Sequence, residues 1–192
     1  MFSNNISYWN EFYKKNTHIA SPSGFCLFVL QYLSDKNIDV KNILDAGCGN
    51  GRDSLKLSEK YNVTGVDNNG FIIENSKKFT FLNENFIKLN KSKYDLIYSR
   101  FTFHSITNEE QLLFLKTIEN NSYLFIETRS DKGINTERYH GDTHFRNFTN
   151  NLYIKNLLTS LGFNILFFEE SDKFAIYKNE NPICIRIIAQ KL

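Results

Sequence analysis

A group of closely spaced glycines directly after a short strand-like segment is the feature that most constrains the fold. The strand pattern covers Asn42–Ala46, residues 47–51 then read Gly-Cys-Gly-Asn-Gly, and a helical pattern begins at Arg52. Because glycine has no β-carbon, the backbone can turn tightly here and come close to a ligand. The first N–H groups of the following helix are then available to an anion or another polar group. The segment predicts a strand, a ligand-binding loop and a helix.

Strand and helix patterns alternate along most of the chain. We expect helices over residues 6–15, 22–33, 52–60, 70–78, 108–119 and 150–161, and strands over residues 42–46, 62–67, 80–83, 94–99, 122–128, 163–169, 174–177 and 183–190. Alternation of this kind implies a parallel sheet with right-handed crossovers. The last two strands have no helix between them, so we expect an antiparallel hairpin at one edge, turning through residues 179–182. The predicted fold class is α/β, a doubly wound, mostly parallel sheet with an antiparallel C-terminal hairpin strand.

The composition excludes several classes of protein. A chain of 192 residues with 41% hydrophobic residues is long enough for one domain with a proper core. The net charge of +2 argues against a general nucleic-acid binder. The three cysteines are far apart and form no disulfide framework, and the N-terminus has no signal-peptide pattern. Since no apolar run reaches the roughly 18–20 residues that span a bilayer, we expect a cytoplasmic protein without membrane contact.

The start of the second helix has a clear capping pattern. Ser21 precedes Pro22, a residue that is favoured in the first turn of a helix. We therefore expect Ser21 to be the N-cap of this helix.

An acidic residue follows the glycine loop at an informative distance. Asp67 ends the predicted strand over residues 62–67, 20 residues after Gly47. A carboxylate at the tip of the neighbouring strand can accept hydrogen bonds from the hydroxyls of a ribose. The dinucleotide fingerprint GxGxxG would need a third glycine at position 52, which is Arg52. A nicotinamide-dependent oxidoreductase is therefore a disfavoured alternative, and a non-catalytic cofactor-binding protein is another.

Three segments resemble a known family. Residues 44–51 (Leu-Asp-Ala-Gly-Cys-Gly-Asn-Gly) resemble motif I of the class I S-adenosylmethionine-dependent methyltransferases. Residues 65–67 (Gly-Val-Asp) resemble their second motif, and residues 94–104 look like their fourth-strand motif. The chain is similar to the small-molecule enzymes of the ubiquinone-biosynthesis and tellurite-resistance kind. The resemblance implies a seven-stranded Rossmann-like sheet, S-adenosyl-L-methionine as cofactor, S-adenosyl-L-homocysteine as product and a small-molecule acceptor.

The resemblance also implies roles for individual residues. Asp45 and the glycines would surround the methionine part of the cofactor, Asp67 would hold the ribose, and Asn68 would flank the adenine. Asn85 stands where many relatives have an aspartate that binds the adenine amino group. Residues 1–40 would form a helical lid, with Tyr8 and Trp9 on an aromatic helix, over a core of residues 41–192 in a single domain. The implied cofactor-binding set is Tyr8, Asp45, Gly47, Cys48, Gly49, Gly51, Arg52, Asp67, Asn68, Asn85, Phe86, Ser99 and Arg100.

The acceptor side is predicted from basic residues after the fourth and fifth strands. His104 is the candidate for a general base or an acceptor contact, which favours oxygen, then nitrogen, as the methylated atom. Guanidinium groups suit phosphate or carboxylate, so we hypothesise a small anionic, phosphorylated or sugar-linked acceptor. His140, Asp142 and His144 could be read as metal ligands, although a metal-free site is preferred. We expect a monomer or a homodimer. The predicted acceptor set is Phe103, His104, Arg129, Arg138, His140, His144 and Arg146.

Overall fold

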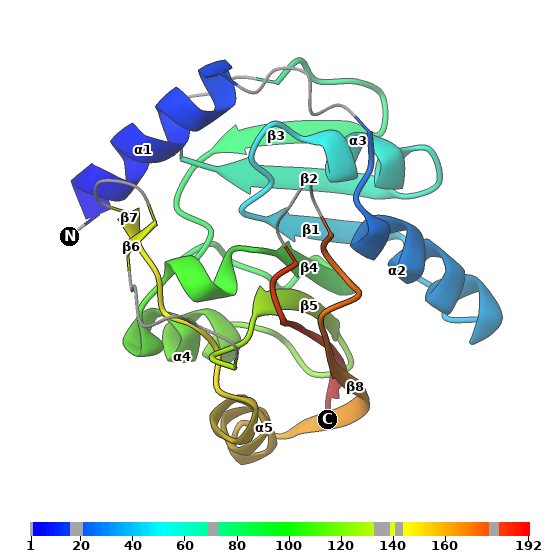
Figure 1. The fold of residues 1–192 in the computed structure, drawn as a ribbon. Helices are drawn as coiled ribbons and strands as arrows, with labels where there is room; N and C mark the ends of the chain where they lie inside the picture. Colours follow the sequence, from blue (N-terminus) through cyan, green and yellow to red (C-terminus); the bar gives the residue numbers. More distant parts are fainter. Residues whose placement is uncertain (1, 16–20, 69–72, 133–138, 141–143, 177–180) are drawn as a thin grey trace.

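A seven-stranded sheet forms the centre of the protein (Figure 1). The computed structural model describes residues 2–15, 21–68, 73–132, 139–140, 144–176 and 181–192. The strand order is β3-β2-β1-β4-β5-β9-β8, and β9 is antiparallel to both of its neighbours while the other pairs are parallel. This confirms the predicted fold class. The strands are β1 (Asn42–Ala46), β2 (Asn62–Asp67), β3 (Phe79–Asn83), β4 (Leu96–Arg100), β5 (Tyr123–Arg129), β8 (Phe163–Ser171) and β9 (Cys184–Lys191).

Helices cover both faces of the sheet. One apolar cluster packs α2 and α3 against one face, and a second packs α4 and α5 against the other. Within β1, Ile43 faces the first cluster while Leu44 and Ala46 face the second, as the alternation of side chains along a strand requires. The helices are α1 (Phe2–Lys15), α2 (Gly24–Asp35), α3 (Arg52–Ser58), α4 (Asn108–Lys116), α5 (Asn151–Ser160) and the 3-10 turn η1 (Phe103–Ser105).

The structure corrects four details of the predicted fold. The N-cap of α2 is Ser23, not Ser21, because the Ser23 side chain accepts the Cys26 N–H. Of the predicted helix over residues 70–78, residues 70–72 lie outside the described residues, and residues 73–78 are not helical but lead directly into β3. Residues 174–176 are not a strand, since β8 continues to Ser171 and pairs with β9 itself. The antiparallel strand β9 lies between β5 and β8 and not at the edge.

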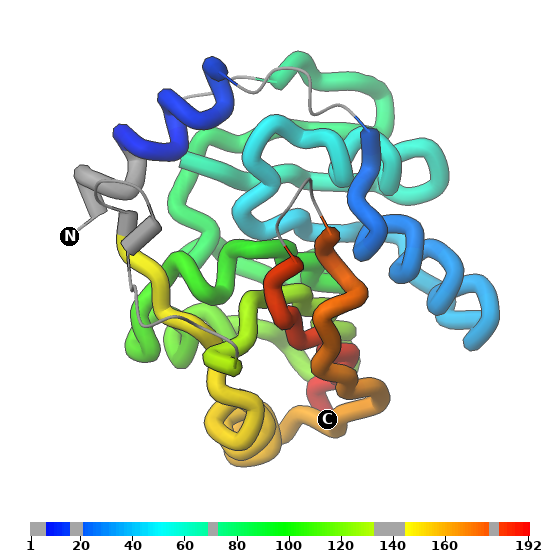
Figure 2. Tube along the Cα trace, viewed as in Figure 1, coloured from blue at the N-terminus to red at the C-terminus, as the bar shows by residue number. Residues whose placement is uncertain are grey.

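The strand order places a ligand site beside β1. The chain winds outward from β1 to β3 on one side and from β4 to β5 on the other, so the order reverses between β1 and β4. Ligands of open α/β sheets bind at such a switch point, outside the carboxyl ends of the strands. The tube view follows the same path of the chain from the glycine loop to β4 and β5 (Figure 2).

Two peripheral elements lie together on one side of the molecule. Helix α1 contacts β7 (His144–Phe145), which pairs with β6 (Tyr139–His140). Figure 1 shows α1 apart from the layer formed by α2 and α3. No helix of the described residues is both long and apolar enough to cross a membrane.

Candidate active site

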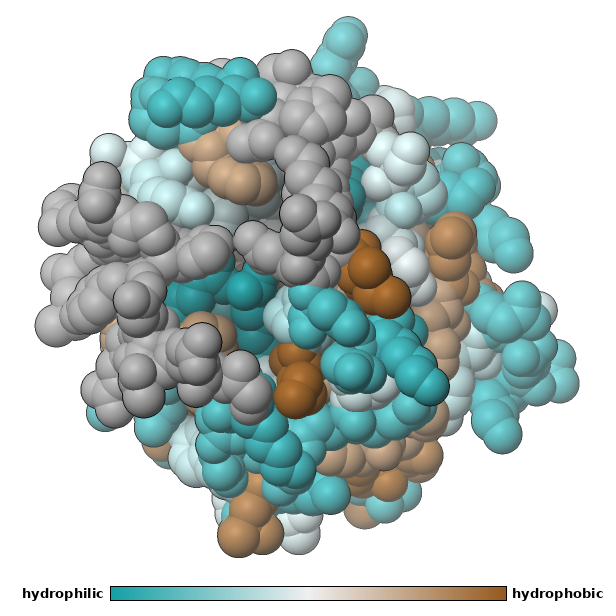
Figure 3. All heavy atoms as spheres, in the orientation of Figure 1, coloured by the Kyte–Doolittle hydropathy of each residue, from teal (hydrophilic) through white to brown (hydrophobic). Residues whose placement is uncertain are grey.

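A cavity of about 580 Å³ lies at the carboxyl ends of β1, β2, β4 and β5. This volume is within the range of about 300–1,000 Å³ that small-molecule sites occupy. Its walls come from α1, the glycine loop, the strand ends and the segment after β8. Figure 3 shows hydrophilic atoms at the bottom of a hollow in this face, with hydrophobic atoms close beside it.

The glycine loop turns as the sequence predicts. Gly47 and Gly49 have φ angles of 78° and 58°, in the left-handed region that favours glycine. A β-carbon at Gly47 would collide with the Thr102 side chain, and one at Gly49 would collide with the Tyr13 hydroxyl. The loop therefore has Thr102, which follows β4, packed on one side and α1 packed on the other. Gly51, with φ 77°, is the N-cap of α3.

Asp67 ends β2 beside this loop. One of its carboxylate oxygens accepts the Gly49 N–H at 2.8 Å, and the side chain lines the cavity. This hydrogen bond holds the glycine loop and the acid together at one edge of the cavity.

Asp45 is a buried acid underneath the loop. Its side chain accepts a 2.6 Å hydrogen bond from the Ser54 hydroxyl. Burial, the largest cause, raises the pKa of the Asp45 carboxyl to about 8; the Ser54 bond lowers it, and the charges of Asp53 and Asp67 raise it. A cationic ligand group beside Asp45 would stabilise the ionised carboxylate.

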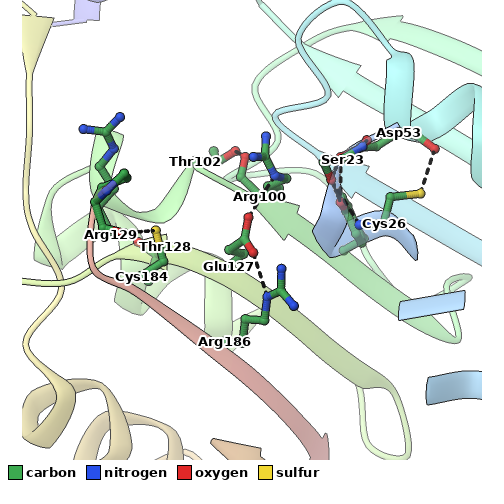
Figure 4. A network of polar contacts seen from close by, with 12 residues as sticks. Ser23, Cys26, Asp53, Arg100, Thr102, Glu127, Thr128, Arg129, Cys184 and Arg186 are labelled. Atoms are coloured by element: carbon green, nitrogen blue, oxygen red, sulfur yellow. Dashed lines mark hydrogen bonds and ion pairs between the residues drawn. The ribbon is translucent and has the colours of Figure 1, made fainter. Parts of the chain in front are cut away.

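Asp53 ties the start of α2 to the start of α3. Its carboxylate accepts the backbone N–H and the hydroxyl of Ser23, both at 2.7 Å, and the Tyr98 hydroxyl at 2.7 Å. Figure 4 shows Ser23 and Cys26 facing Asp53. Because Asp53 lies two residues after the loop, these bonds fix the loop relative to α2.

A buried ion-pair network joins β4, β5 and β9. Glu127 is completely buried and accepts from Arg100 Nε at 2.9 Å and from Arg186 Nε at 2.7 Å (Figure 4). Two cations around one carboxylate leave a net positive charge at the edge of the cavity, which Arg100 lines.

Phe101 is held in an unusual backbone conformation next to Arg100. Its φ angle is 59°, which is costly for an aromatic residue and is concentrated at functional sites. The guanidinium carbons of Arg100 and Arg129 lie 4.2 Å and 5.6 Å from the ring centroid. The His104 ring meets Phe101 edge-on, with centroids 5.5 Å apart. Phe101 is therefore an aromatic platform between basic side chains.

His104 is almost completely buried behind this platform. Its Nδ1 lies 3.3 Å from the Arg129 backbone N and 3.4 Å from the Thr128 hydroxyl, and its Nε2 lies 3.3 Å from Arg146 Nη1. A guanidinium can only donate, and so can the backbone N–H of Arg129. Both ring nitrogens of His104 therefore face a donor, Nε2 the Arg146 guanidinium and Nδ1 the Arg129 N–H.

The structure brings most of the predicted site residues to one cavity. Gly49 and Gly51 shape the loop through their backbone, while Ser99 and Phe103 lie in the interior, 1% exposed, and do not line the cavity. Arg138 and Asp142 are outside the described residues, and His140 and His144 are described only as backbone. The predicted residues that line the cavity are Tyr8, Asp45, Gly47, Cys48, Arg52, Asp67, Asn68, Asn85, Phe86, Arg100, His104, Arg129 and Arg146.

Several cavity residues had not been predicted. Tyr13 and Phe12 share the aromatic face of α1 with Tyr8 and Trp9, a spacing that the sequence already displays. Asp53 stands within the motif and could have been found there, whereas the backbone of Phe101 leaves no trace in the sequence. Residues 174–176, expected to be a strand, also line the cavity. Within the described part of the chain, no group of three potential metal ligands occurs.

Comparison with known proteins agrees with the class of site that the fold and the glycine loop define, a nucleoside-binding site on a Rossmann-like sheet. The sequence profile of the methyltransferase domain matches residues 20–166. The chain belongs to this family and is a methyltransferase. No curated protein sequence matches it.

Solved structures share the fold. An S-adenosylmethionine-dependent methyltransferase from Methanosarcina mazei is 24% identical, with a TM-score of 0.66 over 83% of this chain and 97% of that one. Magnesium protoporphyrin IX methyltransferase from Synechocystis PCC 6803, solved with bound S-adenosylmethionine, is 17% identical, with a TM-score of 0.63 over 87% and 78%. TehB from Haemophilus influenzae is 18% identical, with a TM-score of 0.64 over 96% and 67%.

Proposed function

We propose that this methyltransferase takes its methyl group from S-adenosylmethionine and transfers it to an oxygen, or a nitrogen, of a small anionic metabolite. The observation that carries the proposal is that one cavity combines the glycine loop and Asp67 with the guanidinium groups of Arg100, Arg129 and Arg146. A methyl donor bound to a neighbour of the same fold supports the choice of donor.

The cofactor end of the cavity is formed by the segments after β1, β2 and β3. Asp67 accepts the ribose hydroxyls, Asn68 and Asn85 lie along the adenine, and the carboxyl of Asp45 faces the methionine part. Tyr8 lines the same wall from α1. Of the predicted lid, residues 1–40, it is α1 that covers the donor from this side, whereas α2 packs against the sheet. Both belong to the proposed single domain of residues 1–192.

The donor supplies a methyl group on a sulfonium, which is already activated for displacement. The protein then has to align the acceptor with the methyl carbon and to keep water out. The aromatic face of α1 excludes water on one side of the cavity. Phe101 and the arginines hold the acceptor on the other side, above β4 and β5.

An anionic acceptor follows from the charges at this end. Arg129 and Arg146 approach the cavity from either side of His104, and Arg100 adds a third guanidinium. Forked guanidinium groups bind carboxylate or phosphate with two parallel hydrogen bonds. We infer a small molecule as partner, without nucleic acid or membrane, and a monomer or homodimer in the cytoplasm.

Calorimetry with S-adenosylhomocysteine and with NAD tests the donor. We expect the homocysteine product to bind and NAD not to bind, because Arg52 occupies the position of the third dinucleotide glycine. Tighter binding of NAD would reverse the assignment. The protein is also incubated with methyl-labelled S-adenosylmethionine and a metabolite extract. Label in none of the acidic fractions of the extract would contradict the anionic acceptor.

A further inference from the structure

We infer that the acceptor group is a carboxylate on an apolar or aromatic body, and that the carboxylate oxygen is itself the nucleophile, so that the product is a methyl ester. The inference rests on the proposed function, since it needs a methyl donor at the glycine loop. It goes beyond that function by naming the reacting atom and by removing the need for a general base.

Two arginines provide a site for a carboxylate. The Arg146 side chain is 7% exposed, and its Nη1 is fixed at 3.3 Å from His104 Nε2. The Arg129 guanidinium lies 5.6 Å from the centroid of the Phe101 ring. Both side chains line the cavity on the β4–β5 side, away from Asp67 at the end of β2. Forked guanidinium groups favour a planar anion such as a carboxylate.

The described residues that line the cavity do not offer a base on this side. Nε2 of His104 faces the Arg146 guanidinium and Nδ1 faces the Arg129 backbone N–H, so a lone pair on either ring nitrogen is directed at a donor of the protein. Among the carboxylates, Asp45 accepts from Ser54, and Asp53 accepts from Ser23 and Tyr98. Asp67 binds Gly49 at the cofactor end. A nucleophile that arrives without a proton needs none of these groups.

The thiol and phenol groups of the cavity are kept protonated by their surroundings. Burial raises the pKa of the Cys48 thiol well above its usual range, with Asp45 and Asp67 adding to the effect. Burial also raises the pKa of the Tyr13 and Tyr98 phenols. These groups therefore do not take the proton of a hydroxyl or ammonium acceptor at neutral pH.

Apolar side chains line the same cavity as the two arginines. Trp9 and Phe12 from α1, Phe101 after β4, and Phe174 and Ile176 after β8 line the same cavity. Ile176 is 66% exposed. Such walls gain free energy by covering a ring or an alkyl chain, whereas a sugar or a nucleotide would leave its hydroxyl groups without partners there. The acceptor body is therefore apolar.

The reaction balances without any proton transfer. The carboxylate oxygen forms a bond to the methyl carbon, while the carbon–sulfur bond breaks and its electron pair stays on sulfur. Each carboxylate oxygen has two lone pairs, so an oxygen bound to a guanidinium keeps one for the methyl carbon. The product is a neutral ester, which has lost its ion pair with the arginines and is released.

Label transfer to matched acceptors tests the inference. The full chain is incubated with methyl-labelled S-adenosylmethionine and with benzoate, 3-phenylpropanoate or octanoate, and in parallel with benzamide, 3-phenylpropanol, benzylamine or phenyl phosphate. We expect label on a carboxylate only, and we expect mild alkali to release it as volatile methanol, as ester hydrolysis requires. Binding of each acid to the complex with S-adenosylhomocysteine is measured by calorimetry.

The outcomes separate the inference from the proposed function. Alkali-stable label, transfer to the alcohol, amine or phosphate in preference to the acids, or neither binding nor methylation of any acid overturns the carboxylate acceptor. These results leave the donor assignment standing, provided that S-adenosylhomocysteine binds. Failure of S-adenosylhomocysteine to bind overturns the proposed function itself.

Three variants test the roles of the side chains, and a fourth serves as a control. Arg129→Gln and Arg146→Lys are expected to raise the KM of the accepted acid about 10- to 100-fold, the loss of a charge-assisted hydrogen bond. Lys173→Gln, which removes an exposed positive charge beside Phe174, should leave KM unchanged. His104→Gln should lower kcat by less than about tenfold, because loss of a general base costs about 10²–10⁴. A hundredfold loss of kcat with S-adenosylhomocysteine binding intact would contradict the inference.

Discussion

At the scale of single residues, the proposed donor site depends on Asp67 and Gly49. The Gly49 N–H and the Asp67 carboxylate are 2.8 Å apart, so the loop and the end of β2 form one unit. This unit depends on the carboxylate as an acceptor and on the absence of a side chain at position 49, where Tyr13 fills the space. Donor binding is therefore sensitive to either residue.

Asp67→Ala should weaken S-adenosylhomocysteine binding about 10- to 100-fold, since hydrogen bonds to a charged group contribute about 1.5–3 kcal/mol. Calorimetry measures the change. Asp172→Ala, at an exposed position after β8, is the matched control and should bind normally. Equal affinity of Asp67→Ala and the unmodified protein would remove Asp67 from the donor site.

Asp45 predicts a pH dependence of stability in the absence of ligand. Its folded-state pKa of about 8 is above the unfolded value of 3.8, so the folded state binds the extra proton between these values. The contribution to stability is fully present below about pH 4 and is lost as pH rises through about 8. Urea unfolding measures this effect when the unmodified protein is compared with Asp45→Asn. Between pH 5 and 9, the free energy of unfolding of the unmodified protein should fall by on the order of 2–5 kcal/mol more than that of Asp45→Asn. A pH-independent difference between the two would contradict this prediction.

At the scale of elements, the strands around β5 depend on Glu127. The carboxylate lies between Arg100 on β4 and Arg186 on β9 and is completely buried. Arg186 also stacks on Phe28 and Phe174, with its guanidinium carbon 4.9 Å and 4.2 Å from their ring centroids. One carboxylate thus links the sheet, α2 and the cavity wall after β8.

Glu127→Gln should lower the free energy of unfolding by about 3–5 kcal/mol, because it leaves two buried guanidinium groups without their counter-charge. Urea unfolding at neutral pH measures this loss. Glu84→Gln changes the same charge at an exposed position and should stay within about 0.5 kcal/mol. A Glu127→Gln protein as stable as this control would show that the network does not stabilise the sheet.

Two serines near the start of α2 allow the assignment of its N-cap to be tested with a matched control. Ser23→Ala removes both the cap of α2 and a hydrogen bond to Asp53, and it should cost about 1–3 kcal/mol. Ser21→Ala should cost less than about 0.5 kcal/mol, because Ser21 is exposed and outside the helix. Equal effects of the two substitutions in thermal unfolding would contradict the assignment of Ser23 as the cap.

Elements were predictable where a local pattern agrees with the final contacts. The glycine loop, β1, β2, α4 and α5 follow from spacing and capping residues that need no distant partner. The N-cap of α2 could not be predicted in this way, because Asp53, which lies 30 positions after Ser23, determines which of Ser21 and Ser23 caps the helix. Residues 73–78 carry a helical pattern, but they lead into β3, where pairing with β2 determines the conformation.

The candidate site also has residues that could be predicted from the sequence and others that could not. Asp45 and Asp67 could be found from motif spacing, and Arg129 and Arg146 from their place after β5. The mutual arrangement of His104, Phe101 and Arg146 could not, since it depends on the φ angle of Phe101 and on a chain that returns to His104 through the Asn147 N–H. In the structure, both ring nitrogens of His104, the predicted base, face donors of the protein.

At the scale of the whole molecule, the cavity joins elements from both ends of the chain. Residues of α1 line it together with the ends of β2 and β4 and with residues 174–176. A ligand in this cavity therefore contacts segments that the sheet itself does not hold in place. Ligand binding should stabilise these segments more than the strands.

Hydrogen exchange can measure this effect. Amides of α1 are expected to exchange more slowly when S-adenosylhomocysteine is added, whereas amides of β1 and β4 should be little changed. Arg52→Ala, which we expect to weaken the binding of S-adenosylhomocysteine, serves as the control at the same ligand concentration. Unaltered exchange of α1 at saturating ligand would contradict the lid.

The position of β9 has a consequence for synthesis. Since β9 enters the sheet between β5 and β8, the outer edge of β5 stays without its second neighbour until residues 184–191 have left the ribosome. During that time the nascent chain exposes an apolar edge that other polypeptides can pair with. A chain whose synthesis ends between β8 and β9 would therefore be prone to aggregation.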